Sequence, residues 1–81
     1  MELKILDRIK EDYKNIILDV EFIDFRIYKI TILNIGTNQM SEFNYQYNVN
    51  FTFDYNISII EYKIDKILLS MYKKGGLLCQ I

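Results

Sequence analysis

The sequence contains no histidine, proline, alanine or tryptophan, and it has a single cysteine, Cys79. Without histidine, the nucleophile arrangements that rely on a Ser-His or Cys-His pair cannot form. One cysteine allows no internal disulfide, and without histidine it cannot complete a structural zinc site. The three glycines do not have the spacing of a phosphate-binding loop. These absences predict a non-enzymatic protein without a cofactor or a metal, and the lone cysteine favours a reducing, cytoplasmic setting.

An excess of charge of either sign is also missing, because 10 basic and 11 acidic residues leave a net charge of -1. This balance lacks the basic surface typical of nucleic-acid binders, and no apolar run approaches the length of a membrane span. We therefore expect one domain, residues 1–81, with no direct nucleic-acid partner and no membrane contact. Hydrophobic residues make up 51% of the chain, so we expect a dense core and an apolar patch left for a partner.

Helical and strand periodicities follow one another in the first half of the chain. Leu3, Leu6, Ile9 and Tyr13 recur at spacings of three and four, which predicts an amphipathic helix of roughly three to four turns. Residues 16–23 and 26–34 alternate in polarity and are rich in β-branched and aromatic types, which predicts two strands. No glycine or proline marks a turn between them, so one long bulged strand is the alternative. Gly36 and its neighbouring asparagines indicate a loop over residues 34–42.

The strictest pattern covers residues 43–55. The odd positions are aromatic or valine: Phe43, Tyr45, Tyr47, Val49, Phe51, Phe53 and Tyr55. The even positions are amides, threonine or aspartate: Asn44, Gln46, Asn48, Asn50, Thr52 and Asp54. This alternation predicts one long strand of an antiparallel sheet, with its odd side chains against the helices and its even side chains facing outward.

A second helix is predicted after this strand. Asn56 or Ser58 is expected to cap its N-terminus, and Gly75 is expected to end it after two lysines. Its expected buried stripe consists of Ile60, Ile64, Ile67, Leu68 and Met71. Residues 77–81 form a short final strand or a docked tail. The predicted fold class is therefore α+β, in the order α-β-β-β-α, with two helices packed on one face of an antiparallel three- or four-stranded sheet.

The outward face of the long strand is the candidate site. Asparagine is a poor strand former, so a row of amides suggests a recognition surface, although an ordinary solvated face is the alternative. The acidic residues of the first strand are expected beside it, on the same outer face, with Lys29 pairing across the strands. The candidate partner-binding residues are Asn44, Gln46, Asn48, Asn50, Asp19, Glu21 and Asp24. A long strand at a sheet edge also invites another strand, so a homodimer is a further expectation.

The predicted order of elements is similar to that of the double-stranded-RNA-binding domain. That family carries a basic, alanine-containing start to its last helix and a Gly-Pro loop, whereas this helix opens with NISIIEYKID and the chain has no proline. The resemblance therefore implies topology and not function.

In length, mild acidity, lack of catalytic groups and Ile/Asn/Lys/Tyr bias, the chain resembles the small accessory proteins of bacteriophages and mobile elements, including anti-CRISPR proteins. This resemblance implies a non-enzymatic inhibitor that works in the host cytoplasm. Its target would be a host protein, such as a defence nuclease or a CRISPR effector, which it blocks sterically. The alternative function is a small self-associating nucleic-acid-binding protein that uses Lys4, Arg8, Lys14, Lys73 and Lys74.

Overall fold

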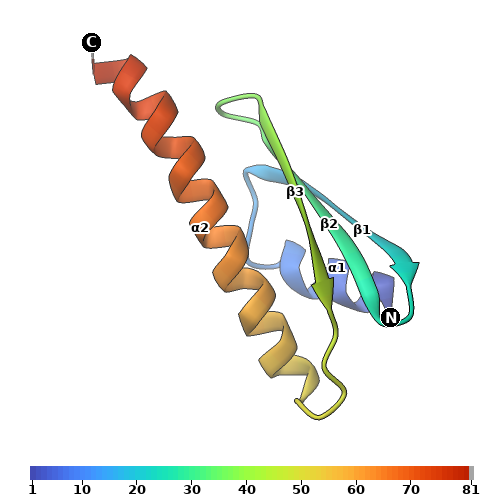
Figure 1. Ribbon diagram of the computed structural model, residues 1–81. Coiled ribbons are helices and arrows are strands. Elements are labelled where there is room, and N and C mark those ends of the chain that lie inside the picture. The colour runs from blue at the N-terminus through green and yellow to red at the C-terminus, as the bar shows by residue number, and fades with distance from the viewer. Residues whose placement is uncertain (81) are drawn as a thin grey trace.

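The computed structural model describes the backbone of residues 1–80 and the side chains of residues 1–71. Five elements follow one another along the chain (Figure 1). They are α1 (Glu2–Lys10), β1 (Ile16–Asp24), β2 (Ile27–Asn34), β3 (Gln39–Gln46) and α2 (Phe53–Gln80). The predicted α+β class and the order α-β-β-β-α are confirmed, with three strands in the sheet.

The sheet is an antiparallel meander in the order β1-β2-β3. The segment for which two interpretations were open is a hairpin, and its β1 strand carries an irregularity between Phe22 and Asp24. Its turn places Arg26 at a φ of 56°, a left-handed conformation that most side chains adopt at a cost of roughly 1–2 kcal/mol. This turn lacks glycine, which explains why the sequence signals it so weakly.

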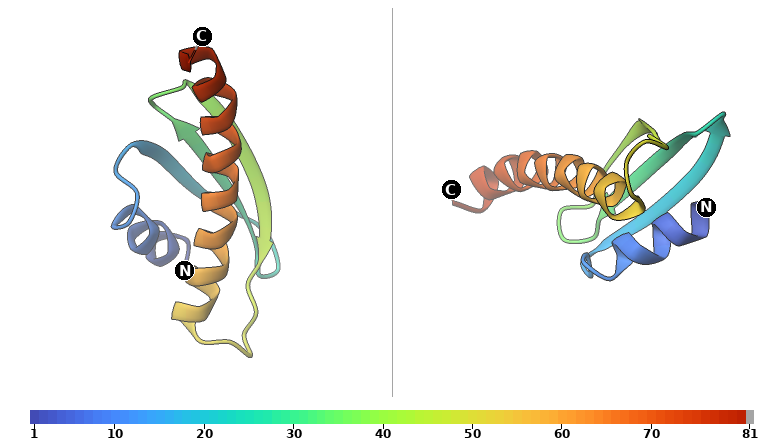
Figure 2. Two further views of the ribbon diagram at one scale, coloured as in Figure 1. Left: turned by 90° about the vertical axis from the view of Figure 1, so that its left-hand side faces the viewer. Right: turned by 90° about the horizontal axis from the view of Figure 1, so that it is seen from below.

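Both helices cover the same face of the sheet (Figure 2). The core between the two layers is built mainly from isoleucine. Ile5 and Ile9 of α1 and Ile60 and Ile64 of α2 are fully buried, as is Ile30 of the central strand. Fully burying such a side chain contributes roughly 1.5–3 kcal/mol, so this set can stabilise a domain of 81 residues without a disulfide.

The first helix is shorter than the periodicity predicts. It ends at Lys10, and Tyr13 lies beyond it, although the Tyr13 ring still packs against the core. Ile9 is buried as predicted, but Leu3, which was expected in the same stripe, is 71% exposed, and Ile5 is buried in its place. Ile9 belongs to two series with helical spacing, Leu3–Leu6–Ile9 and Ile5–Ile9. Spacing alone does not show which of the two series faces the core.

The long strand predicted for residues 43–55 is wrong beyond Gln46. Gln46 pairs with Ile27, the first residue of β2, and one more backbone hydrogen bond follows, from the Tyr47 N–H to the Arg26 carbonyl at 2.7 Å. The chain then turns through residues 47–52, and α2 begins at Phe53. Three of the side chains expected against the helices are consequently exposed: Val49, Phe51 and Tyr55.

The ends of α2 also differ from the prediction. Thr52, and not Asn56 or Ser58, caps the helix, since its Oγ1 accepts a hydrogen bond from the Tyr55 N–H at 3.1 Å. The helix continues through Gly75 and Gly76 to Gln80, so residues 77–80 are not a strand. Ile81 lies outside the described residues. The expected buried stripe is confirmed, with Ile60, Ile64 and Met71 buried and Ile67 and Leu68 partly buried.

Candidate functional site: the open face of the sheet

The sheet face opposite the helices carries the candidate site, and we call it the open face. Its residues are fixed by the strand registers, because directly opposed residues of antiparallel strands point to the same side. Four cross-strand rows cover it from one end to the other. The rows are Ile17–Leu33–Met40, Asp19–Thr31–Glu42, Glu21–Lys29–Asn44 and Asp24–Ile27–Gln46.

The centre of the open face is acidic. Lys29 lies in the middle, with its Nζ 3.5 Å from Glu21 Oε2 and 4.0 Å from Glu42 Oε2. The predicted pairing of Lys29 with a β1 carboxylate is therefore confirmed. Asp19 and Asp24 add two more exposed carboxylates to the same face, so four acidic groups and one lysine lie on it. Exposed ion pairs of this kind contribute little stability, and the excess negative charge remains available to a basic partner.

Apolar side chains border this acidic centre at both ends. At one end, Ile17 is 55% exposed and Met40 is 69% exposed. At the other end, Ile23 and Phe25 are about half and two-thirds exposed, at 48% and 66%. Large apolar side chains exposed on a face that no other element covers can supply contact area to a protein partner, whereas singly scattered apolar residues are ordinary.

A hollow of about 340 Å³ lies beside this second end, between the β1–β2 turn and the segment after β3. Its walls come from Arg26 and from residues 46–50. The Arg26 guanidinium lies 4.3 Å from the centre of the Phe25 ring, which holds the arginine at the rim of the open face. Amide and guanidinium groups together offer both donors and acceptors to a polar ligand group.

Five of the seven predicted binding residues share the open face: Asp19, Glu21, Asp24, Asn44 and Gln46. Asp24 also has a local role, because its Oδ1 accepts a hydrogen bond from the Phe25 N–H at 2.7 Å. The other two residues were misplaced. Asn48 and Asn50 lie in the turn after β3, and Asn48 Oδ1 accepts the Asn50 N–H at 2.9 Å, which makes Asn48 a turn-forming residue.

Sequence reasoning missed Arg26, Phe25, Met40 and Ile17 as site residues. The alternating amides of residues 43–55 placed the predicted site partly on residues beyond the end of β3. The period-2 alternation of residues 16–24 could have placed Ile17 on the outward face. No local signal could have located Arg26, because its position depends on a turn that brings it against a segment about twenty residues later in the chain.

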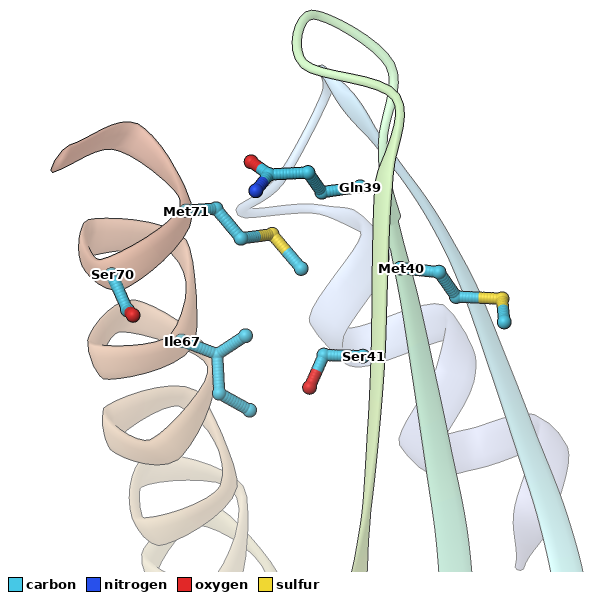
Figure 3. Close-up of a pocket in the computed structure, with 6 residues that line it drawn as sticks. All are labelled: Gln39, Met40, Ser41, Ile67, Ser70 and Met71. Atoms are coloured by element: carbon cyan, nitrogen blue, oxygen red, sulfur yellow. The ribbon is translucent and has the colours of Figure 1, made fainter. Parts of the chain in front are cut away.

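A second hollow, of about 330 Å³, opens between β3 and α2 (Figure 3). Gln39, Ile67 and Met71 point towards one another across it, whereas Met40 points to the open face. Within the described residues, the buried Gln39 Oε1 has no hydrogen-bond partner. The described side chains therefore leave a hollow between the sheet and α2 at this end.

One acidic cluster lies away from the open face, where the segment after α1 meets α2. The Tyr13 hydroxyl donates hydrogen bonds to the Glu61 carbonyl at 3.2 Å and to Asp65 Oδ1. Burial, followed by the neighbouring Asp12 side chain, raises the pKa of the Glu61 carboxyl to about 7. Among the described residues, no group of three or more acidic or cysteine side chains is arranged to hold a metal ion.

Of the basic residues of the alternative function, Lys4, Arg8 and Lys14 lie in the described part of the chain, and the side chains of Lys73 and Lys74 lie outside it. Arg8 Nη1 lies 3.6 Å from Glu11 Oε2 and 3.3 Å from Asp12 Oδ2, so acidic neighbours offset its charge. Lys4 and Lys14 are exposed near the two ends of the first helical segment. Within the described residues, neither helix has an apolar stretch long enough to cross a lipid bilayer.

Comparison with known proteins returned no matching family model, no matching curated sequence and no matching solved structure. The site must therefore be interpreted from its own geometry.

Proposed function

We propose that this chain is a non-enzymatic protein-binding module that docks a host protein on the open face of its sheet. The observation that carries the proposal is the composition of that face, where four carboxylates lie with one lysine and apolar side chains lie at both ends. Apolar residues at the ends can supply contact area, and the charges can select a partner of opposite sign and raise its association rate.

The partner class follows from the charge. Four carboxylates together with the amides of Asn44 and Gln46 suit a basic surface that normally contacts phosphates, because they occupy the same hydrogen-bond donors. The whole-chain resemblance to phage accessory proteins supports the same choice. We therefore propose a phage-type inhibitor that covers the nucleic-acid channel of a bacterial defence nuclease, such as a CRISPR effector.

A phage-plaquing assay tests this function directly. Bacterial strains that each carry one nuclease-based defence system would express the protein and be challenged with a phage that the system restricts. In at least one strain, plaquing is expected to recover by at least about a hundredfold, because a blocked nuclease no longer removes the invading DNA. The purified nuclease and the protein should then form a complex that survives nuclease digestion and gel filtration.

Two charge-reversal variants identify the surface. Asp19→Lys changes an exposed carboxylate of the open face, and Asp7→Lys makes the same change on α1. We expect Asp19→Lys to abolish the recovery and Asp7→Lys to retain it. Equal effects of the two variants would reject the open face. Failure to protect phage in any strain, combined with recovery of nucleic acid and no protein from a cell lysate, would reject the inhibitor and favour the nucleic-acid binder.

A further inference from the structure

Helix α2 carries a second apolar stripe that no part of the described chain covers. Tyr55, Tyr62 and Leu69 recur every seven residues, and their side chains are 53%, 59% and 55% exposed. Seven residues are close to two helical turns, so the three side chains form one line along the helix. This line lies about half a turn from the buried series to which Ile60 and Ile64 belong, so it faces directly away from the sheet.

Charges of opposite sign lie on the two sides of this stripe. Asp65 is on one side and Lys66 on the other, both between Tyr62 and Leu69, and both are exposed. The Lys66 Nζ lies 4.8 Å from the centre of the Tyr62 ring, so the ammonium group already lies against the stripe. Of the two Asp65 carboxylate oxygens, the Tyr13 hydroxyl contacts Oδ1, which leaves Oδ2 for a further contact.

Two copies of α2 bring these opposite charges together only when the two helices are parallel. In a parallel two-fold pair of helices, the acidic side of one helix meets the basic side of the other, as in the flanking ion pairs of parallel coiled coils. In an antiparallel two-fold pair, each side meets its own kind, so Asp65 would face acidic groups and Lys66 would face basic groups. Like charges in contact are destabilising, so the antiparallel pair is disfavoured.

We infer that the stripe is the interface of a parallel homodimer, in which α2 packs along α2 of a second copy. Tyr62 meets Tyr62 of the second copy, and Leu69 meets Leu69 of the second copy. Between these two contacts, each Asp65 forms an ion pair with Lys66 of the other copy. The two-fold axis runs parallel to the helices. The dimer therefore has two ion pairs, and each helix supplies the carboxylate of one and the ammonium group of the other.

The dimer has a consequence that depends on the proposed function. The stripe faces away from the sheet, and the open face is the side of the sheet turned away from the helices. The helices and the sheet form two layers (Figure 2). Pairing through α2 therefore places the two open faces on opposite sides of the dimer, so both remain accessible. One dimer can bind two copies of a partner, and an oligomeric partner is bound with increased avidity.

Sedimentation equilibrium of the purified chain over a range of concentrations tests the dimer. The wild type should reach twice the monomer mass as its concentration rises. Leu69→Glu should remain monomeric, whereas the control Met40→Glu, which changes a comparably exposed apolar residue on the open face, should dimerise like the wild type. Circular dichroism verifies that both variants are folded. A wild type that is monomeric at every concentration overturns the inference, as does a dimer lost only in Met40→Glu.

The ion pairs have their own test, which also decides the orientation of the helices. Lys66→Asp is expected to raise the dissociation constant by about tenfold or more, because it places like charges together. The double variant Asp65→Lys with Lys66→Asp should restore most of the affinity, and an unrestored double variant contradicts the proposed pairs.

Oxidation of Tyr62→Cys in a Cys79→Ser background should give an intersubunit disulfide in the parallel dimer, and a dimer that forms none contradicts the parallel arrangement.

The dimer and the proposed function fail separately. A Leu69→Glu monomer that still protects phage shows that the open face works alone, whereas a dimer that protects phage against no defence system leaves the α2 interface intact and rejects the function. If Leu69 instead contacts a different protein and the wild type stays monomeric, the second copy is the wrong occupant of the stripe.

Discussion

The Tyr45 hydroxyl donates a hydrogen bond to Asn56 Oδ1 at 2.6 Å, which joins the end of β3 to the start of α2. The same Oδ1 accepts the Asn48 N–H at 3.0 Å, and Asn56 Nδ2 donates to the carbonyls of Asn48 and Thr52 at 3.0 and 2.9 Å. Asn56 is fully buried, so these bonds are shielded from water. The amide thereby holds the segment that forms one wall of the hollow beside the open face.

Replacing this amide should be costly. We expect Asn56→Ala to lower the free energy of unfolding by about 3 kcal/mol, since it leaves several buried donors and acceptors without partners and also opens a cavity. Urea denaturation followed by circular dichroism measures the change. The control is Asn50→Ala, an exposed asparagine of the same segment, which should stay within about 0.5 kcal/mol of the wild type. Comparable losses in the two variants would contradict the role assigned to Asn56.

The start of α2 can be verified by a pair of hydroxyl deletions. Thr52→Ala removes the capping bond to the Tyr55 N–H and should cost about 1 kcal/mol. Ser58→Ala removes only a hydroxyl that donates to the Tyr55 carbonyl within the helix, and its effect should be within about 0.5 kcal/mol of zero. Thermal or urea unfolding measures both. The reverse order of effects would mean that the helix begins near Ser58.

Stability should depend on pH through Glu61. Its pKa is raised in the folded protein from 4.5 to about 7, so the folded state binds the proton more tightly than the unfolded state. The stability that this proton binding adds to the folded state is fully present below about pH 4.5 and is lost as pH rises through 7. The groups that face this carboxyl are Asp12, Asp65 and Arg8, and the Arg8 charge opposes the rise.

As pH rises over this range, the wild type should lose stability relative to Glu61→Gln, because glutamine does not titrate. We expect the difference in unfolding free energy to change by about 1–2 kcal/mol, since the site is only partly buried. Urea denaturation at a series of pH values measures it, and an NMR titration of the Glu61 side chain measures the pKa itself. A constant difference, or a titration midpoint near the ordinary glutamate value, would contradict the assignment.

The hollow between β3 and α2 predicts a stabilising substitution. Gln39 points towards Met71, and its Oε1 has no partner among the described residues (Figure 3). Gln39→Met should raise the free energy of unfolding by about 0.5–1 kcal/mol, because it removes an unpaired acceptor at nearly the same volume. Gln46→Met, at an exposed site on the open face, is the control and should not stabilise the protein. Loss of stability in Gln39→Met would show that the amide is bonded to water.

Much of the fold could be predicted because the pattern and the buried surface agree. The alternation around Val20 and Ile30 places apolar side chains on one face, and burying that face is what stabilises the sheet. The stripe around Ile60 and Ile64 indicates a helix for the same reason. The outward position of Glu21 beside Lys29 follows directly, since a strand that buries one face must expose the other.

The segment after Gln46 shows where such reasoning fails. Alternation at Tyr47, Val49 and Phe51 has the period of a strand, but a strand forms only where a neighbour supplies hydrogen bonds. The Tyr47 N–H still donates to the Arg26 carbonyl at 2.7 Å, but β2 begins at Ile27, opposite Gln46, and the paired strand does not extend to Val49 and Phe51. The spacing from Phe53 to Ile57, Ile60 and Ile64 also fits a helix, and docking that helix on the sheet decides between the two periods.

The sequence by itself determined the class and order of the layers: a helix, an antiparallel sheet of three or four strands, a second helix, and a sheet face of carboxylates and amides. These are properties of local spacing, and each segment carries them without reference to the others. Only the tertiary structure decided where β3 ends, which asparagine is buried, and that Arg26 lies against the segment after β3. The physical reason is that backbone hydrogen bonds and buried amides need partners, and those partners are distant in the chain.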